Sequence, residues 1–170
     1  MDLARWRHRE GAKRGELTGR NPTDRAKSGT KRHILADGRG VPLGIAISGA
    51  NMPDMRMALP TIDAAGKVTT PRRRPENCCM DKGYDYPAVH AGVKRRGIVG
   101  HIRRRGESPL LGCVRGKPRR WVVERTNSWH NRFRALLIRW EVRPERYLAL
   151  VKLASAIIAF RMAAKRVTAF

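Results

Sequence analysis

Two carboxylates stand where they could hold a metal ion beside a phosphate. Asp81 opens the segment Asp81-Lys82-Gly83-Tyr84-Asp85 directly after a short apolar run, and Glu124 lies inside the segment 120–126. Carboxylate oxygens are hard ligands, and magnesium usually takes one or two of them together with phosphate oxygens of the substrate. Two such ions about 3.5–4 Å apart stabilise both reacting oxygens of phosphoryl transfer. The residue types therefore indicate metal-dependent chemistry on a phosphate.

The large positive net charge indicates which kind of partner the protein binds. The chain has 14 acidic and 37 basic residues among 170, a net charge of +23 at pH 7. Lys and Arg displace counterions from phosphate backbones, so this excess predicts a nucleic acid. The basic residues are spread along the chain, and the longest apolar stretch, Leu153–Phe160, is too short to span a bilayer. We expect a soluble cytoplasmic protein without a membrane partner.

The hydrophobic pattern predicts elements that place both carboxylates at element ends. Asn77–Met80 is suited to a buried strand, so Asp81 would lie at its carboxyl end, where open α/β sheets place their sites. Gly83 would let the chain turn sharply and leave room for a ligand. The pattern from Trp121 to Trp140 is helical, which puts Glu124 in the first turn. From spacing alone, a strand end for Asp81 and an ion pair of Glu124 with Arg120 are the simpler explanations, and spacing by itself does not settle the question.

The other patterns complete a chain of one domain. A basic arm or loop over 1–30 precedes a folded region over 31–170, which a mixed sheet flanked by helices would form. The elements expected there are a hairpin (31–36 and 41–48) with a turn over 37–40, a helix over 55–65 with Asp54 as its N-cap, a helix over 87–96 stopped by Gly97, a strand over 98–102 and a helix from Pro144.

Several further residue types have simpler explanations than chemistry. Cys78 and Cys79 are adjacent and no C-x-x-C pair exists, which argues against a zinc site or a disulfide scaffold. A hairpin turn explains Asp37, and a helix cap explains Asp54. His33, His101 and His130 lack metal-ligand spacing, so we expect them to be structural or to face DNA. Tryptophans are expected in the core at three positions, Trp121, Trp129 and Trp140.

Read in order, these segments resemble the insertion-sequence transposases of the DDE type, in the IS-Five-like branch. The matching stretches cover nearly the whole chain: Thr18-Gly19-Arg20-Asn21-Pro22-Thr23-Asp24-Arg25, Gly29-Thr30-Lys31-Arg32-His33, Gly40-Val41-Pro42-Leu43, Gly49-Ala50-Asn51 with Asp54, Asp81-Lys82-Gly83-Tyr84-Asp85, Arg96-Gly97-Ile98, 120–126 and Asn131-Arg132-Phe133-Arg134.

The resemblance implies a ribonuclease-H-like fold and a catalytic Asp-Asp-Glu triad that binds two Mg²⁺ or Mn²⁺ ions. Asp81 matches the second acidic position and Glu124 the third. In the family motif around the third acidic residue, this chain keeps the expected Arg at Arg120. It has Lys117 where the motif has Tyr and Asn131 where the motif has Lys. The implied activity is cleavage of element ends and transfer of the freed 3′-hydroxyl to target DNA. Lys82, Arg120 and Arg125 would contact phosphates.

The first Asp of the triad is an open question. The family carries it shortly before the Thr18 segment, and Asp2 is the only Asp ahead of Asp24. Either Asp2 is the third metal ligand, or that ligand is missing. The usual N-terminal DNA-binding region is also not recognisable, so the chain is either the downstream frame of a frameshifted transposase or a remnant. An inactive DNA-binding fragment therefore stays as an alternative, with a basic RNA-binding protein behind it. The resemblance also implies a homo-oligomer in a synaptic complex on the bacterial nucleoid.

Overall fold

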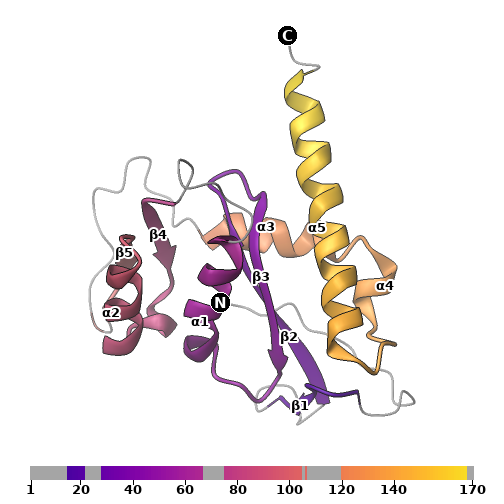
Figure 1. The fold of residues 1–170 in the computed structure, drawn as a ribbon, viewed down its shortest axis with the longest axis horizontal. Coiled ribbons are helices and arrows are strands. Elements are labelled where there is room, and N and C mark those ends of the chain that lie inside the picture. Colours follow the sequence, from indigo (N-terminus) through magenta and orange to yellow (C-terminus); the bar gives the residue numbers. More distant parts are fainter. Residues whose placement is uncertain (1–14, 22–27, 67–74, 105, 107–119, 168–170) are drawn as a thin grey trace.

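The computed structural model describes residues 15–21, 28–66, 75–104, 106 and 120–167. Helices and strands alternate along them (Figure 1), which confirms the mixed α/β class. The strands form two sheets in this part of the chain, rather than the single mixed sheet that the sequence predicts: an antiparallel sheet in the order β1-β2-β3 and a parallel pair β4-β5. The strands are β1 (Gly19–Arg20), β2 (Ser28–Ala36), β3 (Pro42–Gly49), β4 (Asn77–Met80) and β5 (Val99–Ile102).

The β2–β3 hairpin forms where the sequence predicts it. Asp37 Oδ1 accepts hydrogen bonds from the backbone N–H groups of Arg39 (2.9 Å) and Val41 (2.8 Å), which closes the turn. Gly40 has φ of 84°, a left-handed conformation that glycine adopts without strain. The prediction that Asp37 serves the turn is confirmed. Strand β2 begins at Ser28, so residues 28–30 belong to the sheet rather than to a basic arm.

Helices cover the two faces of this hairpin. Alternate residues of a strand point to opposite faces, and Gly44 lies against helix α1 (Asp54–Gly66), whereas Ile45 packs into a cluster with the C-terminal helix α5 (Pro144–Val167). This hydrophobic cluster consists of Ile45, Leu136, Tyr147, Val151 and Ala154. The hairpin is therefore the layer between α1 and α5.

A β-α-β unit joins the other side of α1. Strand β4 leads through the 3-10 turn η2 (Lys82–Tyr84) into helix α2 (Pro87–Arg95), and β5 returns parallel to β4 with Met80 opposite Ile102. Gly97, at φ of 70°, ends α2 as the sequence predicts. Another hydrophobic cluster packs this unit against α1. It consists of Ala58, Ile62, Cys78, Tyr84, Val89, Val93 and Ile98.

The predicted helix over 121–140 is wrong in its second half. Helix α3 (Arg120–His130) ends in a turn, a short helix α4 (Arg134–Leu137) follows, and residues 138–143 are not helical. The N–H groups of Arg132 and Phe133 bond to carbonyls three residues back (3.2 and 3.1 Å), which tightens and ends the helix. Arg32 reaches this turn from β2 and donates to Asn131 Oδ1 at 2.9 Å. Because apolar residues keep a helical spacing on both sides of the break, the pattern does not reveal it.

Two of the three tryptophan predictions are also wrong. Trp140 is 69% exposed and Trp121 is 46% exposed, whereas Trp129 is half-buried. Trp140 lies outside any helix, so its spacing to the apolar residues of α3 has no structural meaning. Its neighbour Arg139 is buried instead, and donates to Thr30 Oγ1 (2.7 Å) and to the carbonyl oxygens of Glu141 (2.8 Å) and Val142 (3.0 Å).

Helix α5 is longer and more apolar than the sequence analysis assumes. By length and composition its segment Pro144–Lys165 could cross a membrane, which alone is weak evidence of a span. One face of its N-terminal half packs on β3 and α4, and its C-terminal half extends beyond the other elements (Figure 1). Phe160 on this extended part is exposed, as is Leu153 in the N-terminal half. We therefore treat α5 as a core helix with a protruding end.

The closeness of α1 to β3 gives a first prediction. A Cβ atom at Gly44 would lie 2.4 Å from the carbonyl oxygen of Thr61, which is helix backbone and cannot turn aside. Gly44→Ala should therefore lower the free energy of unfolding by about 1–3 kcal/mol, measured by urea denaturation. Gly38→Ala is the control, since a Cβ there meets nothing within 4 Å. Equal stabilities of the two variants would contradict this close contact.

Candidate active site

Asp81 follows β4 directly, as the sequence predicts. Its side chain is half-buried, and its Oδ1 accepts a hydrogen bond of 2.9 Å from the N–H of Gly83. This bond caps η2 and fixes the carboxylate at the carboxyl end of the strand. A carboxylate held in one orientation at a strand end can bind a cation without first losing conformational freedom.

Gly83 leaves room for this carboxylate. A Cβ atom on Gly83 would lie 2.9 Å from Asp81 Oδ1, closer than van der Waals contact allows. The structure therefore agrees with the sequence-based expectation that Gly83 serves a tight turn.

The buried phenol of Tyr84 is influenced by the charge of Asp81 and by that of a second carboxylate. The Tyr84 side chain is buried and packs with Ala58 and Met55 of α1. Burial raises the pKa of Tyr84, and the negative charges of Asp54 and Asp81 raise it further. The phenol is therefore bordered by one carboxylate at the start of α1 and another at the end of β4, and it stays protonated at neutral pH.

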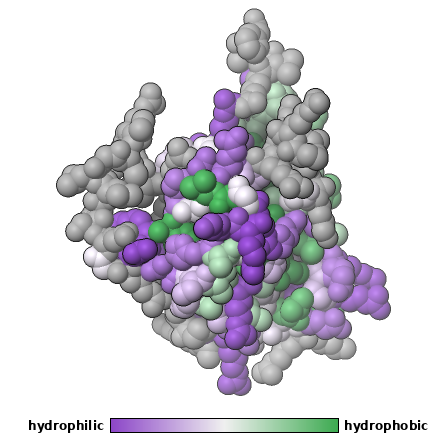
Figure 2. Space-filling model, turned by 60° about the vertical axis from the view of Figure 1, so that its left-hand side comes forward, coloured by the Kyte–Doolittle hydropathy of each residue, from purple (hydrophilic) through white to green (hydrophobic). Residues whose placement is uncertain are grey.

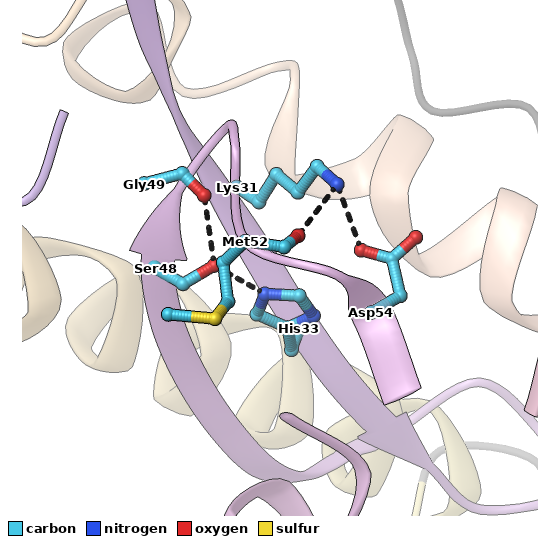
Figure 3. Close-up of polar contacts among 6 residues, drawn as sticks. All are labelled: Lys31, His33, Ser48, Gly49, Met52 and Asp54. Atoms are coloured by element: carbon cyan, nitrogen blue, oxygen red, sulfur yellow. Dashed lines mark hydrogen bonds and ion pairs between the residues drawn. The ribbon is translucent and has the colours of Figure 1, made fainter. Parts of the chain in front are cut away.

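Asp54 is an ion-pair partner rather than a helix cap. Helix α1 begins at Asp54 itself, and Asp54 Oδ1 accepts a hydrogen bond of 3.0 Å from Lys31 Nζ on β2 (Figure 3). The same ammonium donates to the carbonyl oxygen of Met52 at 3.0 Å. The predicted N-cap is therefore wrong, because a charge-assisted bond to a lysine from the adjacent strand takes the carboxylate.

His33 lies buried behind this ion pair, as Figure 3 shows. The Ser48 hydroxyl donates to the carbonyl oxygen of Gly49 (3.2 Å) and lies 2.8 Å from His33 Nε2, so a neutral ring protonated at Nε2 satisfies both contacts. Burial lowers the pKa of His33 to about 4; Asp54 raises it and Lys31 lowers it by smaller amounts. The prediction that His33 is structural is confirmed.

Glu124 is exposed on α3. The helix begins at Arg120, so Glu124 lies just beyond the first turn rather than inside it. Thr126, which is fully buried, anchors this part of α3 to the hairpin, since its Oγ1 lies 2.8 Å from the carbonyl oxygen of Gly40 and 3.0 Å from that of Val122. The position of Glu124 is therefore set by the β2–β3 turn.

His130 anchors the other end of α3. Its Nδ1 donates to the carbonyl oxygen of Thr126 (2.9 Å), and its Nε2 lies 2.7 Å from the Ser155 hydroxyl on α5. Burial lowers the pKa of His130, and the positive charge of Arg32 lowers it as well. The carbonyl oxygen of Thr126 can only accept, so Nδ1 carries a proton, and the Ser155 hydroxyl beside Nε2 donates to the carbonyl oxygen of Val151 (2.8 Å). His130 is thus structural, as the sequence predicts.

Arg125 has a structural role in the described part of the chain. Its guanidinium lies between two indole rings, 4.5 Å from the ring centre of Trp121 and 5.0 Å from that of Trp129, and it donates to the carbonyl oxygen of Arg39. The two ring contacts are cation–π contacts within α3, and the hydrogen bond to Arg39 ties α3 to the hairpin turn. A phosphate contact by Arg125 stays a prediction, and it would compete with this arrangement.

The triad of Asp81, Glu124 and Asp2 stays a prediction, because Asp2 lies outside the described residues. They contain no group of three or more His, Cys, Asp or Glu side chains that could hold a metal ion. Asp2 and the side chain of Arg120 lie outside the described residues. Lys82 is exposed directly after Asp81, and much of the molecular surface on the side of β4, β5 and α2 is hydrophilic (Figure 2).

The Lys31–Asp54 pair is the part of this site that sequence reasoning missed. The two residues are 23 positions apart, one inside a strand and one at the start of a helix. Each has a simpler explanation in the sequence, because alternating strands tolerate a lysine and helix starts favour Asp. The pair becomes a candidate for function only in the tertiary structure, where α1, which begins at Asp54, packs against the η2 turn after Asp81.

Comparison with known proteins identifies the family. The family model of the transposase DDE domain matches residues 4–158. The chain belongs to the DDE transposases. It is 41% identical over 145 residues to a protein of Burkholderia cepacia that is named for its expected role as transposase of insertion sequence element IS402, and the match covers 83% of this chain and 67% of that relative. No solved structure is significantly similar.

Membership of the DDE transposases explains the charge and the carboxylates together. Transposase domains of this family act on DNA and depend on a metal ion, so the +23 net charge and the carboxylate at the end of β4 have a common purpose. A carboxylate, phosphate oxygens and water form a set of oxygen ligands that magnesium accepts, and Asp81 fits such a set.

Gly83 offers a test of the position of the Asp81 carboxylate. Gly83→Ala would push the carboxylate away, and this shift is cheap because the nearest atom belongs to a side chain. We expect DNA cleavage to fall on the order of a hundredfold, while the melting temperature measured by circular dichroism changes little. Gly66→Ala is the control, since a Cβ there meets nothing within 4 Å. Full cleavage activity in Gly83→Ala would contradict a fixed carboxylate.

His33 predicts how stability depends on pH. Its pKa is 6.5 in the unfolded chain and about 4 in the folded chain, so unfolding takes up a proton between these values. The free energy of unfolding should therefore fall as pH drops from 6.5 towards 4, by at most about 3 kcal/mol for this group. In His33→Gln, urea denaturation across this range should show a shallower decline, with His130 still contributing in the same direction. Identical slopes in both proteins would show that His33 is already charged in the folded state.

Proposed function

We propose that this chain is the catalytic domain of an insertion-sequence transposase of the IS-Five-like branch, which cleaves element ends and transfers them to target DNA. The observation that carries this proposal is the capped carboxylate of Asp81 at the end of β4, inside the span that matches the transposase DDE domain. A ribonuclease-H-like arrangement, with Asp81, Glu124 and Asp2 as the triad, is part of the proposal.

The proposed reaction consists of two phosphoryl transfers. In the first, a water oxygen bonds to phosphorus and the bond from that phosphorus to the 3′ oxygen breaks, which leaves a 3′-hydroxyl on the element end. In the second, this hydroxyl oxygen bonds to a phosphorus of the target, and the 3′ oxygen of the target leaves. Bound Mg²⁺ or Mn²⁺, as a pair of ions, would lower the pKa of the attacking group and neutralise the charge that develops on both oxygens.

The residues of this chain have separate parts in the proposed site. Asp81 would hold a metal ion, with its free rotation already restricted by the bond from Gly83. Lys82 would contact a DNA phosphate next to it, with Arg120 and Arg125 contacting phosphates along α3. Tyr84 stays protonated between Asp54 and Asp81, so it adds no third negative charge where the phosphate must approach.

The proposed partners follow from the family and the charge. DNA, as element ends and as target, is the partner that a +23 chain of this family binds. Both element ends must be held together during transfer, so we propose a homo-oligomer in a synaptic complex. The bacterial cytoplasm, on the nucleoid, is the proposed location.

The second candidate function is that of an inactive DNA-binding fragment, and it depends on Asp2, the proposed third ligand, which lies outside the described residues. If Asp2 does not complete the triad, the chain would bind DNA through its basic surface without cutting it. It could then interfere with a full-length transposase.

Removal of single carboxylates decides between these functions. Asp81→Ala and Glu124→Ala should each abolish strand transfer, because a metal ligand is lost, while binding to element-end DNA stays within about threefold since no phosphate contact is removed. Strand transfer would be followed on labelled DNA in Mg²⁺ and in Mn²⁺, and binding by fluorescence anisotropy. Asp63→Ala, which removes an exposed carboxylate at the other end of α1, is the control.

Unchanged strand transfer in the Asp81 or Glu124 variant would overturn the assignment of that residue. A wild-type chain that binds DNA but never transfers strands, in either metal, would support the inactive fragment instead.

A further inference from the structure

The ammonium of Lys31 is fixed in place beside the candidate active site. Only 13% of the Lys31 side chain is exposed, and its Nζ donates to Asp54 Oδ1 and to the carbonyl oxygen of Met52, both at 3.0 Å (Figure 3). An ammonium has three N–H donors. Within the described part of the chain, the third N–H has no hydrogen-bond acceptor.

Asp54 begins α1, and α1 packs against η2, the turn that Asp81 caps. Both carboxylates act on the buried phenol of Tyr84, and α1, which begins at Asp54, packs through Met55 and Ala58 on the cluster that contains Tyr84. Lys31 therefore reaches the region between the start of α1 and the end of β4 from a third element, strand β2.

A lysine held in this way differs from the exposed lysines of a basic surface. A free ammonium loses side-chain entropy when it binds a phosphate. For Lys31 the stem is already buried and the head is already oriented, so binding a phosphate at its third N–H requires little further ordering.

We propose that Lys31 binds a phosphate of the DNA strand that reacts at Asp81, and that Asp54 is a positioning residue that acts through Lys31. This inference rests on the proposed function, because it takes Asp81 as the reacting centre. It adds a fixed cation that orients the phosphate and stabilises its developing charge.

The salt dependence of DNA binding tests the contact directly. The probe is a fluorescein-labelled duplex with the terminal sequence of the element, titrated in EDTA over a series of salt concentrations. Loss of one phosphate contact lowers the slope of log K against log salt by about 0.9. We expect this change for Lys31→Met, no change for Lys31→Arg, which keeps the charge, and no change for Asp54→Asn.

Cleavage of the same duplex in Mg²⁺ tests the positioning role. Lys31→Met should lower kcat on the order of a hundredfold, with a smaller loss in Asp54→Asn because the ammonium stays but is less well oriented. The matched control is Asp63→Asn, which breaks the ion pair of Asp63 with Arg96 (2.6 Å) about 13 Å further along the same helix. It should leave both the salt slope and kcat unchanged.

The double variant Lys31→Met/Asp54→Asn guards against misfolding, because it removes the whole ion pair and leaves no unpaired charge. Circular dichroism melting shows whether each variant is folded. An unchanged salt slope in the folded double variant would overturn the phosphate contact. Failure of the proposed function would look different: Asp81→Ala would then still cleave, whatever the salt slope of the Lys31 variants.

Discussion

The close contact between α1 and strand β3 is the constraint on which the rest of the structure depends. At Gly44 the helix lies so near that a single methyl group would meet the Thr61 carbonyl oxygen at 2.4 Å. Because α1 lies on the hairpin in this way, its opposite side can carry the cluster that includes Cys78 of β4 and Tyr84. Two sheets that share no hydrogen bonds in the described residues are thereby joined through one helix.

The same contact assembles the charged groups of the candidate site. Asp54 begins α1, Lys31 lies on the hairpin and Asp81 ends β4, so each comes from a different element that α1 connects. Glu124 is positioned separately, through the Thr126 and His130 contacts that bind α3 to the hairpin turn and to α5. The described structure thus contains two rigid carboxylate-bearing parts, and the proposed reaction requires both to act on one DNA strand.

Local elements were predictable where short-range chemistry decides them. Asp37 closes its turn through a hydrogen bond to the nearby backbone, and Gly97 ends α2 because glycine tolerates a positive φ. The strand before Asp81 was likewise predictable from its short apolar run. The long helix over 121–140 was not, because apolar residues keep a helical spacing across the break, and the turn there contacts Arg32 of another strand. The core prediction for Trp140 failed for the same reason, since Arg139, with contacts to Thr30 and Val142, takes the buried position.

The sequence by itself determined the family, and with it DNA as the kind of partner, because ordered motifs and net charge do not depend on folding. It also determined the strand end that carries Asp81. Only the tertiary structure decided that Asp54 pairs with Lys31 rather than capping its helix, and that the charges of Asp54 and Asp81 both act on the buried phenol of Tyr84. The physical reason is that an ion pair between residues 23 positions apart leaves no periodic pattern, and forms only when a helix and a strand are packed together.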